Sequence, residues 1–191
     1  MLASVFAGTW DYLMAGTGDG RPPFKTMQAA TIGLDGSPNV RTVVLRKVSE
    51  QQNVITFHTD LRSPKIAELT RDPRIALVGV DAERNVQIRV SGRTRIVRDE
   101  HMRMAAWNAS RLQSLIVYRT LLAPGTEIDQ PRDAFDEARQ PHGPNEGFEN
   151  FCVVDVEPLM IDWLDLSAAG GHERARFQRV DNAWDSCWVA P

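Results

Sequence analysis

The sequence has little cysteine and lacks the residue patterns of metal sites, membrane spans and nucleic-acid surfaces. It has two cysteines, Cys152 and Cys187, without metal-ligand spacing. It has no long basic run, and its formal net charge of −3 argues against nucleic-acid binding as the main function. The N-terminal stretch lacks a cationic start and is interrupted by polar residues, so it predicts neither a signal peptide nor a membrane span. We therefore expect a reduced, cytoplasmic protein that does not bind membranes.

Several catalytic signatures are absent as well. The sequence contains no Ser-His-Asp signature, no Walker loop, no GxGxxG motif and no cluster of metal ligands. The 191 residues are 42% hydrophobic and 25% charged, which is ordinary for a globular chain and enough to bury a core. Length and composition together predict one domain over residues 1–191, and no internal repeat is evident.

Alternating and β-branched patterns dominate the chain and predict a mainly β fold. Apolar residues at helical spacing predict a first helix that ends at Gly16, with Ser4 as one possible cap. Strong turn signals occur at Asp35-Gly36 and Asp181-Asn182, and a bulge is expected at Gly92. Strands are expected in MQAATIGL, RTVVLRK, NVITF, ALVGV, NVQIRVSGRTRIV, FCVVDV, LMIDWLDL, ARFQRV and AWDSCWVA.

Helical segments flank these strands. One begins at Ser63 and ends at Asp72-Pro73, because the residue before proline is disfavoured in the α region. Residues 99–118 predict one or two further helices, and residues 119–147 predict a long loop with four prolines. Seven or eight strands with short antiparallel connections and external helices predict a small closed β-barrel.

The stretch from Arg41 to Lys65 gives the clearest indication of a ligand site. It reads as strand, turn, strand and then a helix that starts at Ser63-Pro64. A helix N-terminus favours anions, and with Lys65, Arg41 and Arg62 nearby in sequence the predicted anion is a phosphate. The alternative is a hairpin that leads into an ordinary capped helix with solvated basic residues, and the residues alone favour it.

The motifs RTVVLRK, FHTDLRSPKIAELTRDPRIAL and NVQIRVSGRTRIV resemble the pyridoxamine 5′-phosphate oxidase family of FMN proteins in order, spacing and residue type. HER and RFQRVDNAWDSCWVAP near the C-terminus resemble it too, so the resemblance covers most of the chain outside residues 110–147. It implies a split antiparallel β-barrel with flanking helices, and a homodimer with FMN at the subunit interface. The implied function is FMN-dependent oxidoreduction of a small molecule. Two alternatives remain open, a true pyridoxamine/pyridoxine 5′-phosphate oxidase and a non-catalytic flavin- or haem-binding module.

The resemblance assigns contacts residue by residue. No residue is assigned as catalytic, and Gln87 and Arg174 are assigned to the partner chain's flavin. The carboxamide of Gln87 can both donate and accept, which suits the polar edge of a flavin ring. The implied cofactor-binding residues are Arg41, Thr42, Val43, Val44, Leu45, Arg46, His58, Thr59, Ser63, Lys65, Gln87 and Arg174. The implied substrate-binding residues are Arg46, Trp107, Arg111 and His172.

Each substrate assignment has a structural alternative. Trp107 and Arg111, at i, i+4 spacing, could be a core tryptophan and a surface arginine, and His172 could be a polar residue in the Gly170-Gly171 turn. The chain also departs from the family pattern, and the losses predict a poor oxidase of pyridoxamine 5′-phosphate. The departures are Arg46 for Lys, His58 for Tyr, Pro64 for Arg, Trp107 for Tyr, Leu115 for Ser, Leu164 for Trp and Gly170 for Arg.

Overall fold

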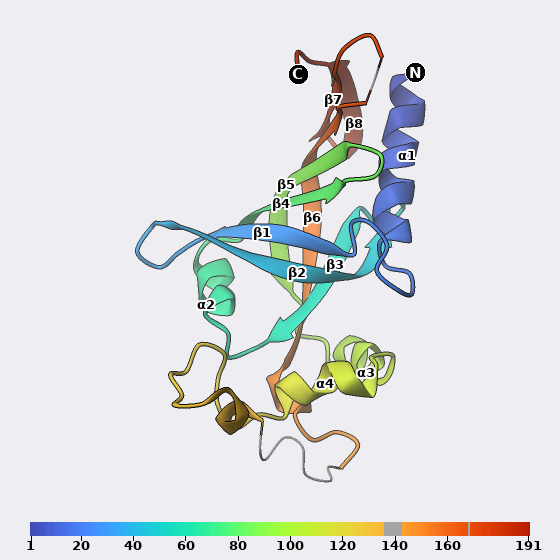
Figure 1. Cartoon of the computed structure of the whole chain (residues 1–191). Coiled ribbons are helices and arrows are strands. Elements are labelled where there is room, and N and C mark those ends of the chain that lie inside the picture. The colour runs from blue at the N-terminus through green and yellow to red at the C-terminus, as the bar shows by residue number, and fades with distance from the viewer. Residues whose placement is uncertain (136–142, 168) are drawn as a thin grey trace.

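The computed structural model describes residues 1–135, 143–167 and 169–191 and shows an antiparallel β-barrel with helices outside it (Figure 1). The strands of the described residues form one sheet in the order β3-β2-β1-β4-β5-β6-β7-β8, and β3 also pairs with β6, which closes the first six into a barrel. The predicted split-barrel fold is confirmed. The strands are β1 Thr26–Ile32, β2 Pro38–Ser49, β3 Val54–Asp60, β4 Arg74–Asp81, β5 Val86–Ile96, β6 Phe151–Asp165, β7 Glu173–Val180 and β8 Ala183–Trp188.

The helices cover the two ends of the barrel and one side. Figure 1 shows α1 beside the β7–β8 hairpin, where both termini lie, and α3 and α4 at the opposite end of β6. None of the helices in the described ranges is long and apolar enough to cross a membrane. Their bounds are α1 Leu2–Ala15, α2 Pro64–Arg71, α3 Glu100–Asn108 and α4 Leu112–Leu115, with short 3-10 helices η1 Ile116–Tyr118, η2 Pro131–Ala134 and η3 Phe148–Asn150.

Two hydrophobic clusters position these elements. The larger fills the barrel with inward residues such as Leu45 and Phe57, and α1 closes it with Trp10 and Leu13. The smaller lies under α3, where Trp107 packs among Phe151, Tyr118, Leu115 and Val153. Aromatic rings in this second cluster meet edge to face, a favourable arrangement that fixes α3 against the lower end of β6.

The two strands expected in FCVVDV and LMIDWLDL are one continuous strand, so that prediction was wrong. β6 runs through Pro158 because the register with β5 shifts between Ser91 and Gly92, at the predicted bulge. The shift leaves Leu159 as the extra residue, and a proline is tolerated at such a bulge. A Cβ on Gly92 would lie 2.2 Å from the Glu157 carbonyl oxygen, so only glycine fits this close approach.

The predicted turns and helix ends are confirmed where they are described, but Ser4 as a cap was wrong, because α1 begins at Leu2 with Met1 as its N-cap. Asp181 and Asn182 both have positive φ, as a two-residue hairpin turn requires, and α1 and α2 end at Gly16 and Asp72. The expected 119–147 loop includes η2, and its residues 136–142 lie outside the described residues. Of the two free thiols, Cys152 is buried and Cys187 is exposed.

Candidate functional site

The start of α2 gathers an ammonium group and two hydroxyl groups. Ser63 precedes the helix with φ −65° and ψ 139°, but its hydroxyl does not cap the helix. The Lys65 Nζ instead donates to Ser63 Oγ at 2.7 Å and to Thr59 Oγ1 at 2.9 Å. We call Thr59, Ser63 and Lys65 the anion cradle.

The positive charge of the anion cradle forms no ion pair with a carboxylate among the described residues. Burial, followed by the nearby charge of Arg41, lowers the pKa of Lys65. Within the described part of the chain, no carboxylate lies within ion-pair distance of Lys65, and the hydroxyl groups that accept from it keep their own protons for donation. An ammonium, two hydroxyls and a helix start are the donor set that phosphate prefers, so these residues fit the phosphate of FMN.

Arg41 faces an internal counter-ion. Its Nη2 lies 2.8 Å from Glu68 Oε2, and Glu68 also accepts from Thr31 Oγ1 at 2.5 Å and Asn39 Nδ2 at 2.7 Å. Burial alone would raise the pKa of Glu68, but these hydrogen bonds and the charge of Arg41 lower it. Arg41 is therefore held in place beside the anion cradle by α2 itself.

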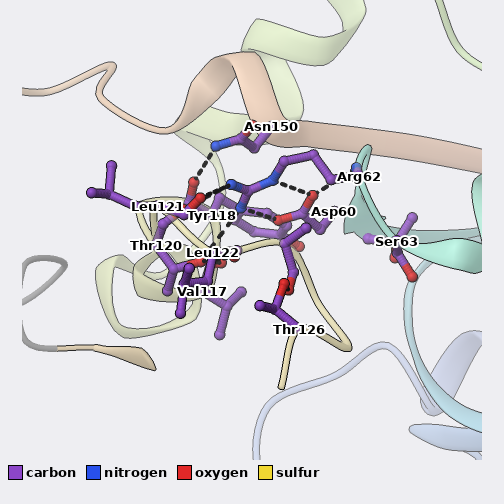
Figure 2. Close-up of polar contacts among 12 residues, drawn as sticks. Asp60, Arg62, Ser63, Val117, Tyr118, Thr120, Leu121, Leu122, Thr126 and Asn150 are labelled. Carbon is purple, nitrogen blue, oxygen red and sulfur yellow. Dashed lines mark hydrogen bonds and ion pairs between the residues drawn. The ribbon is translucent and has the colours of Figure 1, made fainter. Parts of the chain in front are cut away.

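Arg62, which the sequence places near the predicted phosphate, is engaged elsewhere in the structure. Its Nε and Nη2 donate to Asp60 at 3.0 and 2.7 Å, and its Nη1 donates to the carbonyls of Thr120 and Leu121 at 2.9 and 3.1 Å (Figure 2). A guanidinium paired in this way is neutralised by its own carboxylate. Arg62 is therefore not a free cation for a phosphate.

A cavity of about 1090 Å³ lies on the other side of β3, between α3 and the outer barrel face. The small side chains of Ala105, Ala106 and Ala109 form its α3 wall. Five predicted site residues line it, namely Val44, Leu45, Arg46, His58 and Arg111. The anion cradle does not line this cavity, because neighbouring strand residues such as His58 and Thr59 point to opposite faces.

Arg46 occupies a bulge in β2. Leu45 pairs with Phe57 and Lys47 pairs with Thr56, so Arg46 is the extra residue without a partner on β3. Its side chain is exposed to the cavity, and no hydrogen bond or ion pair to it is found among the described residues. Bulges commonly turn a side chain toward a site, and this one leaves a guanidinium available to a ligand.

His58 lies next to Arg46 as a neutral group. Burial, with a smaller contribution from the Arg46 charge, lowers the pKa of His58 to about 4. Its ring packs edge-on against Phe151 with centroids 4.8 Å apart. At neutral pH His58 therefore presents one donor and one acceptor nitrogen to the cavity wall.

Gln87 and Arg174 share one cross-strand row on the outer face of β5, β6 and β7. Gln87 pairs with Leu164, and Leu164 pairs with Arg174. Arg174 binds the buried carboxylate of Asp162 at 3.0 and 2.9 Å, and Arg89 binds the same carboxylate. Trp163, the neighbour of Leu164, points to the opposite face, into the core.

This row is far from the anion cradle within one chain. Thr59 pairs with Cys152 on β6, and Leu164 lies twelve positions further along that strand. At a rise of about 3.3 Å per residue, the separation along β6 is about 40 Å. One mononucleotide cannot contact both groups in the same chain.

The substrate residues are not brought together. Trp107 is buried, and its indole N–H donates to the Pro144 carbonyl at 3.1 Å, so it packs in the core as the structural alternative had it. Arg111 is exposed and pairs with Asp19 at the cavity rim. The two do not share a helix face as expected, because α3 ends at Asn108 and Arg111 precedes α4 in an extended conformation. His172 is exposed in the β6–β7 connection.

Comparisons with known proteins place these features in a family. The profile described as "Pyridoxamine 5'-phosphate oxidase, FMN-binding domain" matches residues 9–98. Pyridoxine/pyridoxamine 5'-phosphate oxidase 2 of Arabidopsis thaliana is 30% identical over 173 residues, which cover 86% of this chain and 84% of that protein. The chain belongs to the pyridoxamine 5′-phosphate oxidase-related, FMN-binding family. The matched range contains every implied cofactor residue except Arg174.

Further relatives in this family agree with the assignment. The Thermosynechococcus vestitus pyridoxine/pyridoxamine 5'-phosphate oxidase is 34% identical over 182 residues, covering 89% of this chain and 81% of that protein. A pyridoxamine 5'-phosphate oxidase-related, FMN binding protein from Nostoc punctiforme superposes with a TM-score of 0.78 at 25% identity, covering 99% and 96% of the two chains. PhzG from Burkholderia lata shares the fold, with a TM-score of 0.76 at 19% identity and coverage of 100% and 93%.

Three charged residues that support the family's motifs were not assigned from sequence. Glu68 holds Arg41, Asp162 holds Arg174, and Asp60 holds Arg62. A charged residue within an apolar strand, such as Asp162 in MIDWL, is a signal for a buried partner. The sequence pattern around Asp162 could not have shown that its partners are Arg89 and Arg174.

Proposed function

We propose that this chain binds FMN and uses it to oxidise or reduce a small molecule. The observation that carries the proposal is Lys65, a partly buried cation with two hydroxyl partners at a helix start. The match to an FMN-binding domain and the relatives named as oxidases support the same conclusion.

In this proposal the protein binds, orients and shields, and bound FMN supplies the hydride chemistry. The anion cradle binds the phosphate, and Glu68 keeps Arg41 beside it. Arg46 and His58 present a cation and a neutral hydrogen-bonding group to a ligand in the large cavity. Such a pair suits a small molecule that carries an anionic group and a polar ring atom.

We also propose a homodimer in which each flavin is lined by both chains. The wide separation of the anion cradle from Gln87 and Arg174 along β6 supports this arrangement. Exposed Val80 and half-buried Leu164 on the outer sheet face offer apolar surface for a second copy. Light scattering at low micromolar concentration should give about twice the chain mass of 21.4 kDa. A monomer that retains flavin would contradict the arrangement.

The free thiols of Cys152 and Cys187 suit a reducing compartment, and we propose the cytoplasm. Burial raises the pKa of Cys152 to about 11, so this thiol is protonated and unreactive at neutral pH. A labelling experiment in intact cells should therefore find Cys187 modified and Cys152 protected.

A true pyridoxamine or pyridoxine 5′-phosphate oxidase is the second candidate, favoured by the names of the relatives at 30% and 34% identity. The geometry gives it little support. Trp107 uses its indole N–H within the core, Leu115 is buried, and Gly170 has no side chain to bind a phosphate. Of the implied substrate-binding residues, Arg46 and Arg111 are the cations that line the cavity. We expect turnover of pyridoxamine 5′-phosphate far below about one per second, the lower end of ordinary enzyme rates.

An absorption spectrum of the purified protein with FMN tests the proposal first. A bound flavin that is reduced rapidly by a nicotinamide cofactor, or by a small-molecule substrate, supports an oxidoreductase. A bound flavin that nothing reduces at catalytic rates would indicate a non-catalytic flavin-binding module. Supplying pyridoxamine 5′-phosphate under air and following pyridoxal phosphate then separates the two oxidoreductase candidates.

A further inference from the structure

Arg62 joins two segments that are far apart in sequence. Its guanidinium lies between the carboxylate of Asp60 and the carbonyls of Thr120 and Leu121 (Figure 2). Asp60 and Arg62 flank the turn from β3 into α2, whereas Thr120 and Leu121 follow η1. The side chain therefore connects the β3–α2 junction to a segment 58 residues away.

A second set of contacts holds the same junction. The Leu61 N–H donates to the Asn150 carbonyl at 2.7 Å. Asn150 Nδ2 donates to the Tyr118 carbonyl at 2.8 Å (Figure 2). The Arg62 and Ser63 N–H groups both donate to Asp60, to its carboxylate and its carbonyl. Three consecutive backbone donors are thereby fixed directly before the helix.

The geometry requires a guanidinium. Arginine presents five N–H donors in a rigid plane, so it can bind a carboxylate on one side and two carbonyls on the other. A lysine has a single nitrogen that cannot span both groups. Thr120 is buried and lies outside the strands and helices, so its carbonyl needs a donor from elsewhere.

The fixed junction leads directly into the anion cradle. Ser63 follows Arg62, and Lys65 binds back to both Ser63 and Thr59, which lie on either side of the Asp60–Arg62 pair. A shift of the junction would change the distance between the two hydroxyls that orient the Lys65 ammonium. Binding a phosphate depends on such positioning as well as on charge.

We propose that Arg62 is a positioning residue for the flavin phosphate. By joining Asp60 to the carbonyls of Thr120 and Leu121, it fixes the β3–α2 junction and so holds Thr59, Ser63 and Lys65 in their binding geometry. The proposal rests on the proposed function, because it requires that the anion cradle binds FMN.

The chain offers a matched control at the other end of α2. Arg74 binds Asp72 through Nε and Nη2, at 2.9 and 2.6 Å, and the Arg74 N–H also donates to that carboxylate. This is the local geometry of Arg62 and Asp60, but the Arg74 side chain has no hydrogen bond to a distant segment among the described residues. Replacing Arg74 removes the same pair chemistry and leaves the anion cradle untouched.

The experiment titrates apo protein with FMN and with riboflavin, which lacks the phosphate, in five full-length proteins. These are the wild type, Arg62→Ala, Arg62→Lys, Arg74→Ala and Lys65→Ala. We expect both Arg62 variants to lose about tenfold in FMN affinity, the scale of one or two lost hydrogen bonds, with riboflavin affinity within about twofold of wild type. Arg74→Ala should match the wild type for both ligands.

The other outcomes would contradict either the positioning role of Arg62 or the phosphate site itself. If Lys65→Ala lowers FMN affinity but both Arg62 variants keep the wild-type ratio of FMN to riboflavin, Arg62 does not position the site. If Arg62→Lys keeps that ratio and Arg62→Ala loses it, Arg62 acts by charge, and the positioning role is wrong. If Lys65→Ala also leaves the ratio unchanged, the anion cradle does not bind the phosphate, and the proposed cofactor site fails with it.

Limited trypsin digestion provides a second measurement in case Arg62→Ala folds poorly. Loss of the contacts to Thr120 and Leu121 should speed cleavage after Arg119 or Arg132 in Arg62→Lys, which keeps a cation beside Asp60. Unchanged cleavage rates together with an unchanged ligand ratio would overturn the proposal without relying on the alanine variant.

Discussion

The two ends of α2 carry the same short motif in different surroundings. Asp60-Leu61-Arg62 precedes the helix and Asp72-Pro73-Arg74 follows it, and in both the arginine binds the carboxylate two residues earlier. The side chains of Arg62 and Asp60 are 25% and 5% exposed, whereas those of Arg74 and Asp72 are 68% and 21% exposed. The buried motif reaches Thr120 and Leu121, and the exposed one contacts no distant segment among the described residues.

The difference shows that a local motif determines local geometry, while burial and neighbours determine its role. At the C-terminal end, hydrogen bonds from Arg74 lower the pKa of Asp72 to about 2, and the pair simply ends the helix. At the N-terminal end, the same pair lies beside Lys65 and Arg41. A surface pair of this kind contributes little to stability, whereas a buried pair can fix a site.

Acid should destabilise the two regions at different pH values. The largest expected effect on stability comes from His58, which lies on β3 two residues before the Asp60-Leu61-Arg62 motif. Its pKa of about 4 lies below the ordinary value of 6.5, so the unfolded state takes up its proton first as pH falls. The contribution of neutral His58 to the free energy of unfolding is fully present above pH 6.5. It is lost as pH falls through about 4, and the loss is roughly 2–3 kcal/mol. Asp72 has a lowered pKa of its own, so its contribution is lost later, between its ordinary value of 3.8 and about 2.

Chemical denaturation of the wild type and His58→Gln across pH 4–7 checks this order. The variant should lose much of the slope, because glutamine does not titrate. His101→Gln, at an exposed position on α3, is the control and should keep the slope. Equal slopes in the wild type and His58→Gln would mean that His58 is not buried in solution.

Removing Glu68, the counter-ion of Arg41, should affect the N-terminal end of α2 and leave the C-terminal end unchanged. Glu68→Gln leaves Arg41, which is 24% exposed, without its carboxylate and should lower the free energy of unfolding by about 2–3 kcal/mol. The same change releases Arg41 from its position beside the anion cradle, so FMN should bind less tightly. Asp72→Asn at the other end should alter neither property measurably. Urea denaturation and FMN titration of both variants give the answer, and unchanged FMN binding by Glu68→Gln would count against a role for Arg41 at the site.

An alkaline titration of FMN affinity gives a smaller effect, which tests the role of Lys65 at the N-terminal end of α2. Because burial and Arg41 lower the pKa of Lys65, its charge should be lost below the ordinary value of 10.5. FMN affinity should therefore fall by about tenfold as pH rises through the lowered pKa, while riboflavin affinity stays constant. Lys65→Arg keeps its charge and should remove the pH dependence. A parallel fall for riboflavin would point to unfolding instead.

Most of the fold was readable from the sequence because its signals are local. The Asp181-Asn182 turn, the Gly92 bulge and the Asp72-Pro73 helix end depend on residues within a few positions of one another. The continuity of β6 through Pro158 was missed because it depends on a register shift opposite Gly92 on another strand. A single strand's pattern does not report its neighbour's register.

The site was readable in part, for the same reason. The helix start at Ser63 and the charge of Lys65 are local features, and the structure places them together. The bulge that exposes Arg46, the contacts of Arg62 with Thr120 and Leu121, and the inward turn of Trp107 are tertiary. Residue type and spacing alone gave no means to choose between a core and a surface position for Trp107.

The most direct test of the account is the ratio of FMN to riboflavin affinity in Lys65→Ala against the wild type, with Arg74→Ala as control. If the start of α2 binds the phosphate, FMN binding should weaken by about 1.5–3 kcal/mol, or roughly 10- to 150-fold, with riboflavin binding unchanged. Arg74→Ala should keep the wild-type ratio. Equal FMN affinity in the wild type and Lys65→Ala would contradict the central claim.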